Sequence, residues 1–504
     1  MSRTPADSRL PGWSLAALVC SAAATATVGA LGPSAAVPPL PGRRWGPLPP
    51  YSLFGPVIGS APAELVSALL AISVLAGAAG LLGALRALSA GWRPDPRRLL
   101  AAGAFAVAVL AVVFPVGSAD PKSYAAYGRM AATGADAYAA TPQQRAAAGD
   151  PVAAAVESPW QNSPSVYGPL ATAEQALIAR VAGDSTRAAV GLLGLINGAA
   201  FLATGAVLQR LADTPQRRRR VAVLWSINPL LLLQLVAGAH LDTLVALAVV
   251  VAVALSFSRS RDCGAASRSV TQGTLAGAAA GAAAALKLPG IAVAAVLLWQ
   301  SRRLSVRFLG ILAGTAAVFG VGYAIVGFHA LNPVRRASRF VSHASPWRPL
   351  AVLLDHFWGT GVSRTVLGLA AATFTVLLAG LFLRALPARG DPRAYSARGT
   401  LALTLAYLLA TPYVLPWYAA SAWALLALLP ASGFDRVLLA HTTVLSLAYI
   451  PGRDVPLPPV LDRIAEATRN VCAPLLLLTV VVGAVVVARR GLASARAERS
   501  ASRY

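Results

Sequence analysis

Long apolar runs separated by clusters of arginine constrain this chain more than any other feature. Such runs recur from Trp13 to Ala488, and 57% of the residues are hydrophobic while only 12% are charged. A helix of roughly 17–25 apolar residues is long enough to cross a bilayer. The pattern predicts an all-α, multi-pass membrane protein over residues 13–489, with a short N-terminal tail at 1–12 and a basic, disordered cytoplasmic tail at 490–504.

The arginine clusters predict which side of the membrane each loop occupies. The net charge is +24, but the basic residues stand in short groups between apolar runs. This arrangement is typical of cytoplasmic loops beside anionic lipid, so we expect plasma-membrane lipid rather than nucleic acid as a partner. The rule gives about 12–14 crossings, with Arg217–Arg220 inside and the segment after residue 117 outside. It also predicts that 169–183 lies on the outer surface or dips partway in, because a crossing there would put Arg217–Arg220 outside.

Two further features of the chain have simple readings. The first apolar run follows Arg3 and Arg9 and resembles a signal peptide, but its length favours a retained first helix. Cys20, Cys263 and Cys472 lie far apart and show neither metal nor redox spacing, so no disulfide is indicated.

The segment 118–168 is too long and too rich in acids and aromatic rings to be a simple connector. Asp120 stands first in it, directly after an apolar run. Pro121 follows and biases Asp120 toward an extended backbone, so we expect the preceding helix to stop there.

A second outer loop, 329–349, departs from the charge rule because it carries several arginines on the side where basic residues are normally few. A bound phosphate would explain Arg335, Arg336, Arg339 and Arg348, and contact with lipid headgroups is the alternative.

Two junctions between apolar runs also carry charge. His240 and Asp242 lie in one, Lys287 lies in the other, and both junctions are expected to face outward. The flanking runs are short, which suits a cavity that opens to the outer face better than full spans. His240 and Asp242 are two residues apart and would not share a helical face, so no metal site is expected from this pair.

Six motifs occur in order between residues 99 and 430: DPKSYAAYG, GADAYAATP, SVYGPL, AGAHLDTL, AALKLPG and YVLPWY. Together they resemble the GT-C glycosyltransferases, most closely the polyprenol-phosphomannose-dependent α-1,6-mannosyltransferases of actinobacterial envelopes. The resemblance implies transfer of mannose from a lipid phosphate at the outer face, with inversion and without a nucleotide sugar or cofactor. It also implies an aspartate base in the first large outer loop, which is Asp120 here. Leu241 departs from the family, where Asn is frequent.

These residues divide into roles that glycosyl transfer requires. Asp120 would take the acceptor proton, the alternative being a local pair with Lys122. Lys287 and the four arginines would hold the donor phosphate, although a lysine at a helix end also snorkels to the interface. The substrate contacts would include His240 and Asp242, together with rings that equally suit interfacial anchoring: Tyr124, Tyr127, Tyr138, Trp160, Tyr167 and Trp417.

A transporter or flippase of lipid-linked sugars is the alternative function. Such proteins show internal repeats and ionisable residues near the bilayer centre. The ionisable residues here gather toward one face, and no repeat is evident, which favours the enzyme.

Overall fold

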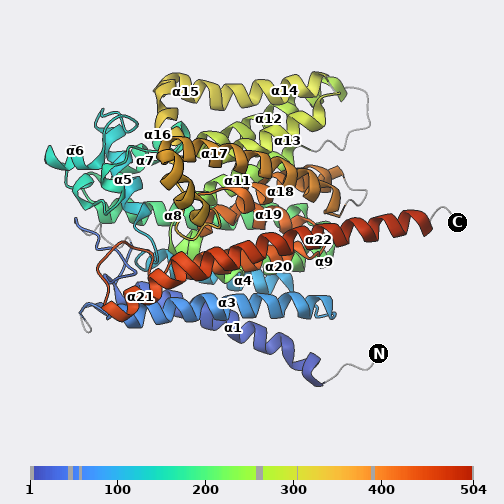
Figure 1. The fold of residues 1–504 in the computed structure, drawn as a ribbon, viewed down its shortest axis with the longest axis horizontal. Helices are drawn as coiled ribbons and strands as arrows, with labels where there is room; N and C mark the ends of the chain where they lie inside the picture. The colour runs from blue at the N-terminus through green and yellow to red at the C-terminus, as the bar shows by residue number, and fades with distance from the viewer. Residues whose placement is uncertain are drawn as a thin grey trace.

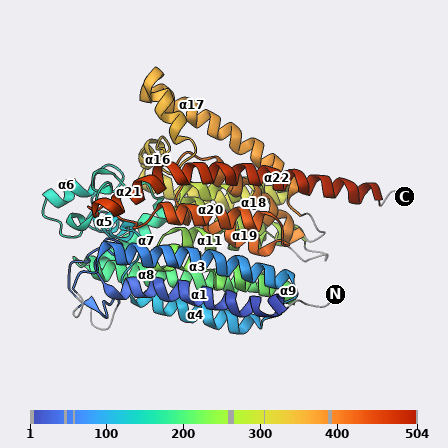
Figure 2. The ribbon, with the colours of Figure 1, turned by 60° about the horizontal axis from the view of Figure 1, so that its bottom comes forward.

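The computed structural model describes residues 5–43, 49–55, 59–256, 265–303, 305–387 and 392–501. Most helices run along the long axis of a single bundle (Figure 1). The described ends of the chain, in α1 and α22, lie toward one end of the bundle, and α5, α6, α7 and α21 cluster at the opposite end (Figures 1 and 2). Within the described ranges the only β-type pairings are two isolated bridges, Ser34 with Val37 and Tyr51 with Val113.

The first part of the chain, up to residue 255, forms elements with these bounds: α1 (Pro5–Leu31), α3 (Ala63–Ser89), α4 (Pro96–Val112), α5 (Asp120–Ala132), α6 (Pro142–Ala147), η1 (Ala153–Ala155), η2 (Trp160–Asn162), α7 (Pro169–Ala182), α8 (Thr186–Leu211), α9 (Pro215–Val221), η3 (Ala222–Ser226), α10 (Pro229–Leu231), η4 (Leu232–Ala237) and α11 (Asp242–Leu255).

The second part continues the bundle with these elements: α12 (Ala265–Leu286), η5 (Leu288–Gly290), α13 (Ile291–Ser301), α14 (Ser305–Thr315), η6 (Ala316–Gly320), α15 (Val321–Val326), η7 (Phe328–Ala330), α16 (Leu331–Ala337), α17 (Arg348–Ala385), α18 (Pro392–Ala410), η8 (Pro416–Ala419), α19 (Ala420–Leu428), α20 (Phe434–Ala448), α21 (Pro459–Ala467), η9 (Thr468–Cys472) and α22 (Ala473–Ala501).

Seven of the described helical stretches are long and apolar enough to span a membrane, and two more, 242–255 and 288–301, are apolar but shorter. The seven are Leu10–Leu31, Ala63–Ser89, Thr186–Leu211, Pro215–Ala237, Val306–Val326, Arg348–Ala385 and Pro459–Ser494. The predicted all-α, multi-pass membrane architecture is therefore confirmed. The larger number of crossings expected from the sequence included helices that are shorter or less apolar than these seven.

Small residues bring the helices into close contact. A Cβ added at Gly314 in α14 would lie 2.0 Å from the Thr274 carbonyl oxygen of α12, and one at Gly277 would lie 2.1 Å from the Ile311 carbonyl oxygen. Neither position has room for a side chain, so glycine lets these two helices approach backbone to backbone. Packing of this kind associates helices in a medium that offers no hydrophobic driving force between them.

The structure corrects several details of the sequence prediction. The basic tail predicted to be disordered is helical as far as Ala501, because α22 continues beyond the apolar run. Arg348 does not lie within a loop but begins α17, whose helical backbone is broken at Gly359 (φ 73°, ψ 162°). The helix before Lys287, α12, has 22 residues and is not short. Residues 257–264, which include Cys263 and two arginines of a predicted inner cluster, lie outside the described residues.

Candidate active site

Asp120 is positioned by an extended segment that is held on several sides. The Val116 N–H donates to the Ala237 carbonyl (2.9 Å), and the Gly117 N–H donates to the Ala36 carbonyl (2.8 Å). From the other side Gly452 (φ 97°) packs so closely that an added Cβ would lie 2.1 Å from the Gly117 carbonyl oxygen. Three distant parts of the chain therefore fix the backbone that leads to Asp120.

Asp120 begins a helix and does not end one, which corrects the sequence prediction. The preceding helix, α4, already stops at Val112, and α5 starts at Asp120 with Pro121 in its first turn. Proline is well tolerated in that position because the first N–H groups of a helix have no intrahelical acceptor. The Asp120 N–H donates instead to the Ser118 hydroxyl (3.1 Å). The segment 118–168, predicted to be a large outer loop, is thus an ordered assembly of short helices and turns.

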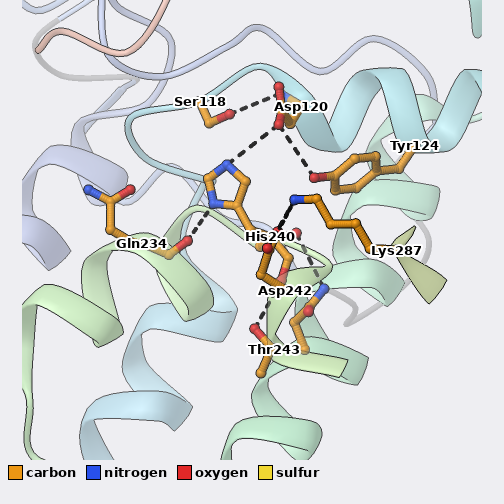
Figure 3. A network of polar contacts seen from close by, with 10 residues as sticks. Ser118, Asp120, Tyr124, Gln234, His240, Asp242, Thr243 and Lys287 are labelled. Carbon is orange, nitrogen blue, oxygen red and sulfur yellow. Dashed lines mark hydrogen bonds and ion pairs between the residues drawn. The ribbon is translucent and has the colours of Figure 1, made fainter. Parts of the chain in front are cut away.

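His240 faces Asp120 from the turn between η4 and α11 (Figure 3). Its Nε2 lies 3.7 Å from Asp120 Oδ2, and its Nδ1 lies 2.5 Å from the Gln234 carbonyl oxygen. The ring stacks on Trp417 with centroids 3.6 Å apart and planes 14° apart. Ala239 precedes it with a left-handed backbone (φ 49°), uncommon for a residue other than glycine. The argument from helical faces did not foresee this contact, because His240 lies in a turn.

Asp242 and Lys287 form a buried ion pair beside this contact. Lys287 Nζ donates to both carboxylate oxygens of Asp242, at 2.9 and 2.8 Å (Figure 3). The same ammonium lies 3.8 Å from the centroid of the Tyr418 ring. Lys287 directly follows α12, and this ion pair draws it inward rather than toward lipid headgroups. The sequence had left both orientations open.

Burial makes Asp120 a stronger base than an ordinary carboxylate. Desolvation raises its pKa to about 6, although Lys287 and the Tyr124 hydroxyl act in the opposite direction and Asp242 adds to the rise. The Tyr124 hydroxyl donates to Oδ2 (3.4 Å), the oxygen that also faces His240. No described residue hydrogen-bonds to Oδ1, which leaves that oxygen available to a substrate.

These groups adjoin a cavity of about 560 Å³. Its charged lining residues, among the part of the chain that is described, are Asp120 and Lys287. Aromatic rings form much of the wall: Tyr127, Trp160, Tyr167, Tyr407, Tyr413, Trp417 and Tyr418. Gly368, Ala371, Ala372 and Thr375 of α17 line a further part, which lies within a helix long and apolar enough to span a membrane. The cavity therefore joins a polar, aromatic end to a side formed by a membrane helix.

The predicted substrate contacts divide into those that line the cavity and those that do not. Tyr127, Trp160, Tyr167 and Trp417 line it. Tyr124 is only 1% exposed and contacts Asp120 instead, with its ring edge-on to Tyr167 at 5.0 Å. A different location was found for Tyr138. Its hydroxyl hydrogen-bonds to that of Thr172 (2.8 Å), and its ring packs in a separate apolar cluster.

None of the four predicted phosphate-binding arginines lines the cavity, and three of them neighbour lining residues in the chain. Arg335, Arg336 and Arg339 are exposed on and just after α16, while Val334, Ala337 and Ser338 of the same stretch line the cavity. Arg348 is half-buried at the start of α17. No ion pair joins these four arginines to an acid within the described ranges, so they could meet an anionic ligand at the cavity edge without first breaking a salt bridge.

Sequence reasoning missed a cluster of ion pairs next to α5, in which Glu157 bonds to both Lys122 and Arg453. We call this cluster the clasp. Glu157 accepts hydrogen bonds from Lys122 Nζ (2.6 Å) and from Arg453 Nε and Nη2 (2.8 Å each). Arg453 also donates to the Ser34 and Val37 carbonyls. Lys122 is therefore occupied by Glu157, and the alternative in which it pairs with Asp120 is wrong. Arg453 also lies in a predicted outer segment, where arginines are normally few. The same departure from the charge rule that drew attention to residues 335–348 could therefore have identified Arg453.

With this geometry in view, comparison with known proteins is informative. The sequence model of the alpha-(1->6)-mannopyranosyltransferase family, N-terminal domain, matches residues 19–303, which is more than half of the chain. The chain belongs to this family. The match includes Asp120, His240, Asp242 and Lys287, and the family resemblance read from the motifs is confirmed.

Two individual relatives align with this chain, one over a shorter segment and the other at low sequence identity. Alpha-(1->6)-mannopyranosyltransferase B of Corynebacterium glutamicum is 33% identical over 143 residues, which are 27% of this chain and 23% of that protein. The cryo-EM structure of arabinosyltransferase EmbB from Mycobacterium smegmatis aligns with 86% of this chain and 45% of its own, at 15% identity and a TM-score of 0.34. The chain therefore spans less than half the length of either relative in these alignments.

Proposed function

We propose that this family member is an integral-membrane mannosyltransferase. It transfers mannose from a polyprenyl-phosphate donor to a growing glycan or glycolipid of the α-1,6-mannan type, on the outer face and with inversion. The observation that carries the proposal is the cavity in which Asp120, Lys287 and a wall of aromatic rings meet beside a membrane helix. The family assignment of residues 19–303 supports mannose as the sugar.

Asp120 acts as the general base. The acceptor hydroxyl loses its proton to Asp120 as its oxygen bonds to the anomeric carbon, while the bond from that carbon to the phosphate oxygen breaks. The bond's electron pair leaves with the lipid phosphate. A pKa of about 6 keeps the carboxylate ionised at neutral pH, yet makes it a better proton acceptor than an exposed aspartate. Attack from the side opposite the phosphate gives inversion.

Lys287 stabilises the departing phosphate. Its ammonium lines the cavity and is held in place by Asp242, so it need not be reoriented during the reaction. The pair is nearly neutral as a unit, and additional positive charge would come from the arginines at 335–348. The lipid chain of the donor lies along α17, where small side chains leave room for it.

A product assay tests the proposal. Purified protein in lipid vesicles receives radiolabelled polyprenyl-phosphate mannose and a mannan or glycolipid acceptor. Label in an acceptor that α-1,6-mannosidase digests supports the proposal, and protected donor accumulating in the opposite leaflet without product would identify a flippase instead. Asp136→Asn is the matched control for variants of Asp120, because Asp136 shares the outer segment but is bound to His329 (2.7 Å).

A second experiment tests the outward orientation. Figures 1 and 2 show α5 and α9 at opposite ends of the bundle. Gln143→Cys, in α6, and Gln216→Cys, in α9, are both exposed positions and can be introduced after replacing Cys20, Cys263 and Cys472. We expect an impermeant thiol reagent to label only residue 143 in intact cells, since basic clusters resist translocation. The reverse labelling would move the site to the cytoplasmic face.

A further inference from the structure

The environment of His240 gives this residue a more specific role than substrate contact. The side chain is fully buried, with 0% of its surface exposed, and its Nε2 has no hydrogen-bond partner. Buried polar atoms are nearly always paired, and an exception calls for an explanation. Nε2 points at Asp120 Oδ2 across 3.7 Å, a distance that is close but too long for a hydrogen bond.

The tautomer of His240 follows from its other nitrogen. Nδ1 lies 2.5 Å from the Gln234 carbonyl oxygen, which can only accept, so Nδ1 carries the hydrogen. Desolvation lowers the pKa of His240 to about 3, and the ring is neutral at physiological pH. Nε2 therefore presents a lone pair toward Asp120. The stack on Trp417 prevents the ring from turning away.

The Nε2 lone pair makes no favourable interaction with an ionised carboxylate. It accepts a hydrogen bond when the carboxyl group is protonated. We infer that His240 is a positioning residue that receives the hydrogen bond of Asp120 after Asp120 has taken the acceptor proton. The inference rests on the proposed transferase function and deepens it.

The proton balance is simple. The acceptor hydroxyl gives its proton to Oδ1, and rotation about the Cβ–Cγ bond brings the protonated oxygen to Nε2, where the O–H donates. The proton stays on the carboxyl group and returns to solvent or to the departing phosphate when product leaves. The histidine remains neutral throughout, and no further reactant is needed.

Several other groups influence Asp120 and must be considered in any pH experiment. The charged ones are Asp242 and Lys287, which neutralise each other, and the remainder are Tyr124, Tyr127, Tyr167, Tyr413 and Tyr449. Burial raises the pKa of each of these tyrosines far above neutrality, so they stay protonated over the range in which Asp120 titrates.

The test is the pH profile of kcat in three proteins: wild type, His240→Phe and His240→Gln. Phenylalanine keeps a ring to stack on Trp417 but has no lone pair, while glutamine offers an amide oxygen near the position of Nε2. A hydrogen bond to the protonated form raises a carboxyl pKa. In His240→Phe we therefore expect the acidic fall of the kcat profile, its acid limb, to shift to lower pH by about one unit. The plateau of kcat should fall roughly three- to tenfold. His240→Gln should keep the limb near its wild-type position.

The outcomes separate this role from a structural one. An acid limb that does not move in His240→Phe overturns the inference, whatever the loss of kcat, because a packing defect lowers the active fraction equally at all pH values. His240→Leu is read in the same way if His240→Phe does not fold. His441→Phe is the control for placing phenylalanine at another buried histidine, on α20. Wild-type protein that makes no product would instead reject the proposed function.

Discussion

Two buried contacts of an aspartate occupy different regions of the molecule: the Arg220–Asp435 ion pair and the approach of neutral His240 to Asp120. They differ in how completely their hydrogen-bonding groups are used. Arg220, in α9, makes two bonds to Asp435 (2.6 and 2.8 Å) and donates to the carbonyls of Leu426 and Leu429. Around Asp120, by contrast, no described residue hydrogen-bonds to Oδ1, and His240 Nε2 is unpaired at 3.7 Å from Oδ2. A saturated pair stabilises the fold, whereas unused bonding capacity beside a cavity is available to a ligand.

The largest expected effect comes from removing the base. Asp120→Asn keeps the shape of the side chain but not its basicity, and should lower the transfer rate by about 10²–10⁴. Membrane yield and thermal unfolding should stay close to wild type, because the site is not required for packing. Near-normal transfer by Asp120→Asn, with loss in the Asp136→Asn control, would show that the base had been misassigned.

Loss of the saturated Arg220–Asp435 pair should lower the stability of the protein and leave its transfer rate unchanged. Arg220→Met leaves Asp435 buried without a partner, and such a loss typically costs about 3–5 kcal/mol of stability. Thermal unfolding of the detergent-purified protein measures it, and the rate per folded molecule should not change. The double variant Arg220→Met/Asp435→Leu should recover much of the stability. A variant that stays stable but loses transfer would contradict the contrast between the two contacts.

Donor affinity should depend on Lys287. Each hydrogen bond to a charged group contributes about 1.5–3 kcal/mol, so Lys287→Met should raise the KM for the donor roughly ten- to a hundredfold. The KM for the acceptor should change much less. Lys287→Met/Asp242→Asn separates the lost phosphate contact from the cost of an unpaired Asp242.

Arg339→Gln should show the same preference for donor over acceptor with a smaller change, because Arg339 is exposed to solvent and its interactions are weakened by screening. If KM for the donor is unchanged in both variants, at normal membrane levels, neither residue is a phosphate ligand, and Arg339 is instead a lipid anchor.

The smallest expected effect is the pH dependence of the wild-type rate. Because Asp120 must be deprotonated to act as a base and burial raises its pKa to about 6, kcat/KM should fall tenfold per pH unit below that value. Above it the carboxylate is ionised and the rate should level off. A limb near the usual aspartate pKa of about 4 would mean that the site is hydrated when substrate binds.

The sequence predicted individual residues better than it predicted their contacts. Asp120, Lys287 and Trp417, which line the cavity, were selected because motif and charge mark them locally. The approach of His240 to Asp120 joins residues far apart in the chain, through a turn whose left-handed Ala239 no periodicity reveals. Tyr138 has the same local character as Tyr127 but packs elsewhere. The positions of the helices followed the apolar runs, whereas helix ends, such as that of α22, and breaks, such as Gly359, did not.

The clasp of Glu157 by Arg453 has a consequence for biosynthesis. Membrane chains are inserted from the N-terminus onward, and when residue 303 has emerged the chain already contains Asp120, His240 and Lys287. It still lacks Trp417, which holds His240, and Arg453, which secures the segment behind α5. A chain that stops near residue 303 therefore lacks the side chains that hold His240 and α5 in place in the described structure.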